Sequence, residues 1–213
     1  MARAAPSGAG DTLVFLADIA AVSDARLARY AAWLGAPEAA RCEGFVRAER
    51  RRQFIAGRAL LRLGLARLLG IDPGTVALCE RPGQAPALLD SLSGAAWFSI
   101  AHSGTWIGCA VSTAGAVGFD LERIDATRDV LALAEQAFDA GRVAELQAVG
   151  GEARVAAFYR MWCAHEARIK LGEDSAMLYP YALPGVAGAL ACAPDAGAAP
   201  TIAFVDLGKE WDA

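Results

Sequence analysis

The sequence predicts an α+β fold, and three observations lead to this prediction. Apolar residues recur at helical spacing in two long segments, residues 43–69 and 153–171. Shorter apolar runs are separated by clusters of Gly, Pro and Ser, which is typical of strands and turns. Of the 213 residues, 55% are hydrophobic and 21% are charged, which is enough for a packed interior and argues against disorder. Packed helices and strands are therefore expected together.

The first part of the chain is expected to begin with a frayed leader, because residues 1–11 are rich in Ala, Gly, Ser and Pro. A short strand follows over residues 12–17, and a helix over 24–34 is ended by Gly35-Ala36-Pro37. The long helix over 43–69 should present an apolar face and, beside it, a stripe of Arg. The apolar face carries Phe54, Leu61, Leu65 and Leu68, and the stripe carries Arg47, Arg51, Arg58 and Arg62.

Strand and turn patterns occupy the middle of the chain. Residues 75–79 predict a strand, and a turn rich in Pro and Gly follows it. A β-hairpin is expected over 96–100 and 106–112, with its break at His102-Ser103-Gly104-Thr105, followed by a strand over 117–124. Helices are then expected over 130–138, 141–149 and 153–171, with short strands in the last forty residues. The similar order of elements in the two halves suggests a duplicated unit.

Charge is distributed unevenly along the chain. The formal net charge of −4 argues against general nucleic-acid binding. Between Arg41 and Arg67, however, eight Arg stand against two Glu, a local charge of +6. A solvated helix face is the common meaning of such a run, although so many Arg with so few acids also suits an anion site. The rest of the chain has a net charge of −10, which disfavours nucleic acid as its ligand.

The five cysteines are far apart, odd in number and never in a C-x-x-C pair, which argues against a disulfide framework or a zinc site. They indicate a reducing compartment. The first eleven residues contain no apolar core of signal-peptide length, and the apolar stretch over 186–193 is short and flanked by Pro184 and Pro194. We expect a soluble, cytoplasmic protein without a membrane segment.

The segment Gly118-Phe119-Asp120-Leu121-Glu122 is the most informative short motif. On a strand, residues two apart project from the same face, so Asp120 and Glu122 present two carboxylates together. Their mutual repulsion would be relieved by a cation such as Mg²⁺, which takes oxygen ligands. A solvated strand face is the alternative interpretation.

A second candidate lies on the helix over 153–171. Glu166 falls at the edge of its apolar face, where a partly buried carboxylate is costly unless it is paired or bound to a metal. The alternative is a salt bridge to Lys170, four residues further on. A third candidate is His102, beside Gly104 in the hairpin break, where an imidazole can donate to phosphate oxygens. The apolar face of the helix is expected to carry Val155, Phe158, Trp162 and Ile169.

Taken together, these motifs resemble one family. G-F-D-L-E is followed about forty residues later by W-x-x-x-E-A-x-x-K, and is preceded by F-S-I-x-H-S and F-I-A-G-R-A-L-L-R. This order and spacing resembles the 4′-phosphopantetheinyl transferases of the Sfp, or surfactin-synthetase-activating, type, over residues of about 35 to 172. The resemblance implies a pseudo-dimer of two similar α+β halves, here 1–115 and 116–213, with coenzyme A in the cleft between them.

The resemblance also assigns roles to matching residues. Three carboxylates match the family's Mg²⁺ ligands, namely Asp120, Glu122 and Glu166, and Glu166 also matches its general base. His102 and Lys170 match phosphate contacts of coenzyme A.

Four further residues match the part of the family that binds the nucleotide. Arg41 and Arg58 fall in the region that holds the 3′-phosphate of coenzyme A, and Arg81 and Gln84 border the nucleotide. Guanidinium groups suit this task because they bind phosphate through two parallel hydrogen bonds.

Three positions depart from the family pattern. His165 stands in place of a Lys, Ala101 in place of a Ser, and Gln84 in place of the Lys of a G-K-P turn. A neutral imidazole still donates one hydrogen bond, so His165 is kept as a candidate catalytic residue.

The implied activity is Mg²⁺-dependent transfer of 4′-phosphopantetheine from coenzyme A to a serine of an apo acyl or peptidyl carrier protein, with release of 3′,5′-adenosine diphosphate. The pseudo-dimer would act as a monomer. The first alternative is a homologue that binds coenzyme A or a carrier protein without efficient transfer, as the three departures suggest. The second is another metal-dependent reaction on the phosphoester of a nucleotide.

Overall fold

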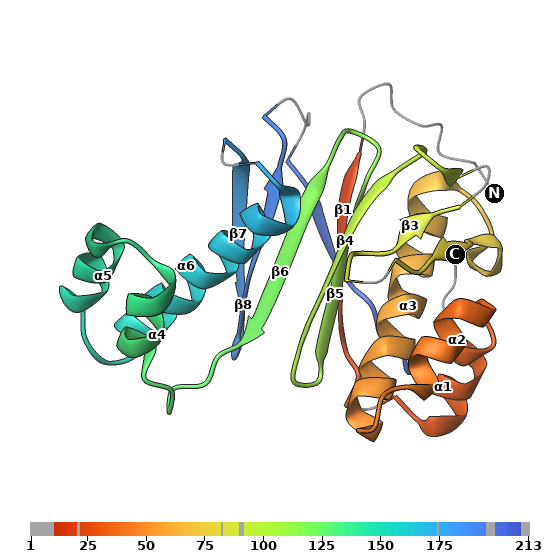
Figure 1. Cartoon of the computed structure of the whole chain (residues 1–213), viewed down its shortest axis with the longest axis horizontal. Helices are drawn as coiled ribbons and strands as arrows, with labels where there is room; N and C mark the ends of the chain where they lie inside the picture. The colour runs from red at the N-terminus through yellow and green to blue at the C-terminus, as the bar shows by residue number, and fades with distance from the viewer. Residues whose placement is uncertain are drawn as a thin grey trace.

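Two β-sheets lie in the middle of the molecule, with helices on the outer side of each (Figure 1). The computed structural model describes residues 11–20, 22–81, 83–89, 92–173, 175–194 and 199–209. Within these residues the fold is α+β, so the predicted class is confirmed. Nearly all of the predicted leader falls outside the described residues.

The first sheet has the strand order β4-β5-β1-β9 in the described part of the chain. Its neighbours pair antiparallel, except that β9 runs parallel to β1. The C-terminal part of the chain thus returns to complete the sheet that the N-terminal part begins. These strands are β1 (Thr12–Asp18), β4 (Trp97–Ser103), β5 (Trp106–Ser112) and β9 (Thr201–Phe204).

Helix α3 (Ala48–Leu69) covers the outer face of the first sheet, and α1 (Asp24–Ala31) and α2 (Ala36–Glu43) pack against α3 from the other side (Figure 1). Because α3 is enclosed, every residue from Ala56 to Ala66 is buried. A short 3-10 helix (Pro73–Thr75) and a ladder of β2 (Leu78–Cys79) with β3 (Ala87–Leu88) follow it.

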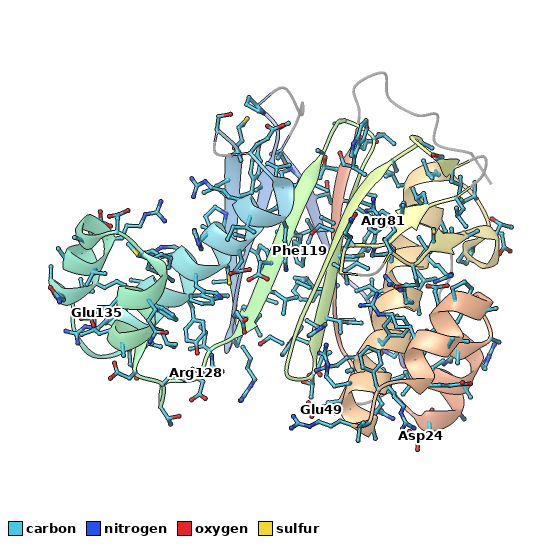
Figure 2. All side chains as sticks on the ribbon, in the orientation of Figure 1. Asp24, Glu49, Arg81, Phe119, Arg128 and Glu135 are labelled. Atoms are coloured by element: carbon cyan, nitrogen blue, oxygen red, sulfur yellow. The ribbon has the colours of Figure 1, made fainter. Side chains whose placement is uncertain are left out.

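The second sheet is antiparallel, with the order β6-β8-β7 among the described residues. One of its faces meets the first sheet, and Phe119 lies between the two sheets (Figure 2). Its other face packs on α6, with α4 and α5 further out (Figure 1). The elements are β6 (Val117–Arg123), α4 (Val130–Ala137), α5 (Ala140–Gln147), α6 (Gly151–Leu171), β7 (Met177–Leu183) and β8 (Val186–Cys192).

Several predicted elements need correction. The helix predicted over 43–69 begins only at Ala48, because residues 44–47 form the break between it and α2, a helix that was not predicted. Pro37 does not end a helix there but lies in the first turn of α2, where its missing N–H costs nothing. The strand predicted over 75–79 is limited to Leu78–Cys79. The hairpin turn is Gly104-Thr105 alone, so His102 lies on β4.

Two predicted surfaces also differ from the structure. Arg58 and Arg62, predicted to share one stripe with Arg47 and Arg51, are buried at 5% and 1% exposure, so a solvated face does not describe this part of the stripe. Ile169, assigned to the apolar face of its helix, is 58% exposed.

A buried ion-pair network explains why these two arginines lie inside. Glu38 of α2 is completely buried, and its Oε2 accepts a hydrogen bond from Arg62 Nη2 at 2.5 Å. Arg58 Nε lies 3.2 Å from Glu38 Oε1. Glu80, after β2, forms ion pairs with both Arg58 and Arg41. The network therefore joins α2, α3 and the segment after β2 in one charged cluster.

We predict that Glu38→Gln lowers the free energy of unfolding by about 3 to 5 kcal/mol, because the substitution leaves the buried guanidinium group of Arg62 without a balancing carboxylate. Urea denaturation measures the change. The control is Asp206→Asn, whose ion pair with Lys209 is exposed and should contribute less than about 1 kcal/mol. Similar losses in the two variants would contradict the prediction.

Helix α6 approaches β6 so closely that only glycine fits at position 118. A Cβ atom there would lie 2.0 Å from the Ala167 carbonyl oxygen and 2.5 Å from Leu171 N. Because both contacts are backbone atoms, the helix itself would have to move. Gly118 thus fixes the distance between β6 and the part of α6 that carries Glu166 and Lys170.

Gly118→Ala should therefore destabilise the fold by about 1 to 3 kcal/mol or more. The matched control is Gly57→Ala in α3, where a Cβ would lie 3.8 Å from Ile100 Cγ2, an ordinary contact. That change should be neutral or stabilise the helix by about 1 kcal/mol. Thermal unfolding of both variants tests this, and equal midpoints would show that α6 is not held by this contact.

All five cysteines are free thiols, in agreement with the predicted absence of a disulfide framework. Among the described residues, no helix combines the length and the apolar character that crossing a bilayer requires.

Candidate active site

Asp120 and Glu122 lie on the same side of β6, as their spacing predicts, and Asp120 is buried at 6% exposure. Asp120 Oδ1 accepts a hydrogen bond from Lys170 Nζ at 2.7 Å, and the same ammonium donates to the Phe119 carbonyl oxygen at 3.1 Å. Lys170 thus pairs with Asp120, and forms no ion pair with Glu166 in the described structure, so the predicted alternative of an i, i+4 salt bridge is wrong.

The surroundings of Asp120 disfavour the charged form of its carboxyl group. Burial raises its pKa above the ordinary value, Lys170 opposes this shift, and the charges of Glu122 and Glu166 add to it. Its second oxygen, Oδ2, is buried and has no hydrogen-bond partner among the described residues. The orphaned Oδ2 and the nearby carboxylates of Glu122 and Glu166 offer oxygen donors of the kind that a hard cation such as Mg²⁺ takes.

The three carboxylates are not drawn together around a common point. In the described part of the chain, no three His, Cys, Asp or Glu side chains stand close enough to hold a metal ion. Instead, Lys170 occupies Asp120 Oδ1, and the Ser103 hydroxyl donates to Glu122 Oε2 at 2.5 Å. Asp120 and Glu122 thus each have one oxygen paired with a neighbouring donor.

Beside this cluster lies a pocket of about 480 Å³. Its lining includes Arg41, Arg58, Gln84, His102 and Lys170, five of the six residues predicted to bind coenzyme A. The sixth, Arg81, is not part of the lining, and its Nε donates to the Ala85 carbonyl oxygen at 2.8 Å. The pocket therefore gathers predicted residues from α2, α3, β4, α6 and the segment before β3.

Arg41 and Arg58 of the pocket differ in burial and in the number of ion pairs that they form. Arg58 is buried between Glu38 and Glu80, and burial lowers its pKa. Arg41 is also paired with Glu80, but 47% of its side chain is exposed. Arg41 is thus better placed than Arg58 to meet an anion.

Sequence reasoning missed most of a stretch of α3 that forms one wall of the pocket, since Arg58 is the one residue of this wall that was predicted to bind coenzyme A. Its residues recur at intervals of three and four, the spacing of a single helix face. This spacing is visible in the sequence. However, Phe54 was assigned to the apolar face and Arg58 to the Arg stripe, so the common face was not recognised. The wall consists of Arg50, Gln53, Phe54, Gly57 and Arg58.

His102 lies against this wall. Arg50 Nη1 is 2.9 Å from its Nε2 and 3.2 Å from its Nδ1. Burial lowers the pKa of His102, and the positive charge of Arg50 lowers it further, followed by that of Lys170. Both effects favour the neutral form of the His102 imidazole, which can serve a ligand as a hydrogen-bonding group.

His165 lies apart from this pocket. Its ring meets Phe138 edge-on, with the ring centroids 5.6 Å apart. It borders a second pocket, together with Arg142, Arg168 and Ile169.

The comparisons with known proteins point to one family. Residues 116–207 match the model of the 4′-phosphopantetheinyl transferase superfamily. HetI of Nostoc sp., a 4′-phosphopantetheinyl transferase, is 33% identical over 71% of this chain and 64% of its own length. The chain belongs to the 4′-phosphopantetheinyl transferase superfamily. The resemblance drawn from the motifs is thereby confirmed.

Two further relatives carry the same family name. AcpT of Salmonella typhimurium is 35% identical over 60% of this chain and 62% of its own length. The 4′-phosphopantetheinyl transferase of Bacillus subtilis is 29% identical over 67% of this chain and 61% of its own length. The chain spans roughly three fifths of the length of these transferases.

Since this chain has two histidines, proton NMR can follow the titration of each one. We predict that the pKa of His102 lies below its ordinary value and rises in Arg50→Gln, because the neighbouring guanidinium charge is removed. The control is Arg51→Gln, whose guanidinium donates to the Phe45 carbonyl oxygen and makes no contact with the ring. An unchanged midpoint in Arg50→Gln would show that Arg50 does not set the charge of His102.

Proposed function

We propose that this chain transfers the 4′-phosphopantetheine group of coenzyme A to a serine hydroxyl of an apo acyl or peptidyl carrier protein. The position of Lys170 carries the proposal. Its side chain borders the Arg-lined pocket, and its Nζ donates to Asp120 Oδ1 at 2.7 Å. The Lys170 ammonium thus lies at a pocket suited to anions and also contacts the carboxylate of Asp120. Coenzyme A offers a matching pair of groups, a 3′-phosphate and a diphosphate.

Binding falls to the pocket residues in this proposal. Arg41 meets the 3′-phosphate, because its side chain is half exposed while Arg58 is held by Glu38 and Glu80. Arg58 then serves mainly to anchor Glu80, which pairs with Arg41. Arg81 and Gln84 border the nucleotide, and Gln84 lines the pocket.

The chemistry falls to the groups around Asp120. The serine oxygen of the carrier forms a bond to the β-phosphorus, and the bond from that phosphorus to the departing 3′,5′-adenosine diphosphate breaks. Glu166 takes the proton of the serine hydroxyl. Lys170 and His102 hold phosphate oxygens by hydrogen bonds. Asp120, Glu122 and Glu166 would hold Mg²⁺, which when bound neutralises negative charge on the diphosphate.

The arrangement of the chain is part of the same proposal. The helix and strands of each region, α3 with β4 and β5, and α6 with β6 and β8, would be the two halves of a pseudo-dimer divided near residue 115. Such a chain would need no second copy to complete its site. Its monomeric state and its cytoplasmic location stay predictions.

A second candidate function is binding without efficient transfer. The observation that favours it is the place of His165, which stands where the family has a Lys but packs on Phe138 instead of lining the main pocket. In that case the protein would bind coenzyme A or a carrier protein, and no carrier would gain mass.

The test is incubation of the protein with coenzyme A, Mg²⁺ and several apo carrier proteins, with each carrier followed by intact-protein mass spectrometry. We predict that one carrier gains a phosphopantetheine group and that chelation of the metal blocks the gain. Asp120→Asn should reduce the rate by about 100-fold or more, because it removes a charged oxygen ligand. The fold should persist, as judged by circular dichroism.

The matched control is Glu135→Gln on α4, an exposed carboxylate far from the site, at the left of Figure 2. Its rate should equal that of the wild type. Near-normal transfer by Asp120→Asn would overturn the assignment of the carboxylates. Binding of coenzyme A in calorimetry, without transfer to any carrier, would favour the second candidate function.

A further inference from the structure

Strands β4 and β6 run alongside each other at the line where the two sheets meet, yet they belong to different sheets (Figure 1). Two serine hydroxyls of β4 bridge the gap. Ser99 Oγ accepts a hydrogen bond from Phe119 N at 3.0 Å, and Ser103 Oγ accepts one from Arg123 N, also at 3.0 Å. Both pairs are four residues apart on their strands, so the two bonds hold β4 and β6 parallel and in register.

The two serines differ in what their hydroxyl hydrogens do. Ser99 Oγ lies 3.5 Å from the Phe119 carbonyl oxygen, at the limit of a hydrogen bond. Ser103 donates to Glu122 Oε2 at 2.5 Å, a bond from a hydroxyl to a charged carboxylate. Among the described residues, Ser103 is the one hydrogen-bond partner of that carboxylate. The Glu122 side chain is therefore oriented by a residue of the first sheet.

The orientation of the Ser103 hydroxyl is itself fixed. Its oxygen accepts from a backbone N–H of β6 and its hydrogen points to a carboxylate one residue earlier on the same strand. A hydroxyl held at both ends cannot rotate freely. It immobilises one carboxylate oxygen of Glu122 and leaves the other, Oε1, without a hydrogen-bond partner in the described structure.

We propose that Ser103 is a positioning residue, which fixes one oxygen of the Glu122 carboxylate, leaves the other available to a divalent cation, and couples this orientation to the contact between the two sheets. The inference rests on the proposed function of Asp120, Glu122 and Glu166 as ligands. Groups that hold a metal ligand by hydrogen bonding change metal affinity by about 10- to 100-fold when they are removed. Ser103 thus acts through Glu122 and touches no reacting atom.

The test measures Mn²⁺ binding to the full chain by electron paramagnetic resonance, without coenzyme A or carrier protein. Ser103→Ala should weaken Mn²⁺ binding by about tenfold. Ser103→Thr keeps the hydroxyl and should restore binding to within about twofold of the wild type. Ser99→Ala is the matched control, because it removes the same kind of bond between the strands without touching a carboxylate, and should leave Mn²⁺ affinity unchanged.

Thermal unfolding separates a positioning role from a structural one. Ser99→Ala and Ser103→Ala should lower the midpoint by similar amounts, while only Ser103→Ala weakens Mn²⁺ binding. Equal Mn²⁺ affinities in the two variants would overturn the role of Ser103. A further arm uses Asp120→Asn. If this substitution leaves Mn²⁺ binding unchanged, the metal centre itself is wrong and the inference fails with it, whereas loss of binding in Asp120→Asn with none in Ser103→Ala refutes the positioning role alone.

Discussion

Strand β6 is enclosed on both faces, and two glycines allow its neighbours to come close enough. On one face, a Cβ atom at Gly108 of β5 would lie 2.6 Å from the Phe119 ring and 2.8 Å from Leu121 Cδ2. On the other, a Cβ at Gly118 would meet the backbone of α6. Side chains alternate along a strand, so a one-residue shift of β6 would turn every side chain to the opposite face. The close contacts on both faces prevent such a shift. Asp120 is thereby buried against α6, within reach of Lys170.

The pocket depends on a second constraint, the buried charges of α2 and α3. Glu38 and Glu80 hold three arginines, of which Arg62 and Arg58 are buried and Arg41 is half exposed. A cluster of this kind gains little net stability, because desolvation offsets much of the attraction, but it penalises any arrangement that separates its members. It holds α2, α3 and the segment after β2 in a fixed relation and leaves Arg41 partly open to the pocket.

Local pattern explains which parts of this molecule could be predicted. Asp120 and Glu122 share a face because of strand geometry alone, and α6 followed from its helical spacing. The burial of Arg62 could not be foreseen, because its partner Glu38 lies 24 residues earlier, on a helix that was not predicted. The predicted partner of Lys170 was wrong for the same reason, because its actual partner lies far away in the sequence. The sequence suggested Glu166, four residues away on the same helix, whereas the ammonium reaches Asp120 on another element.

The carboxylates and the pocket meet at few points, and this bears on how the site would work. Lys170 reaches across from α6 to the pocket, and Ser103 reaches across from β4 to Glu122. These side chains therefore link the regions of the two sheets, whereas no backbone hydrogen-bond ladder joins β4 to β6. A shift of one sheet against the other would change the Glu122–Ser103 contact and the place of Lys170 at the pocket together. Tight packing around β6 is thus a condition for the proposed chemistry as well as for the fold, because Arg41 and His102, which would bind phosphate, and the carboxylates, which would bind the cation, are positioned from opposite sides of the same seam.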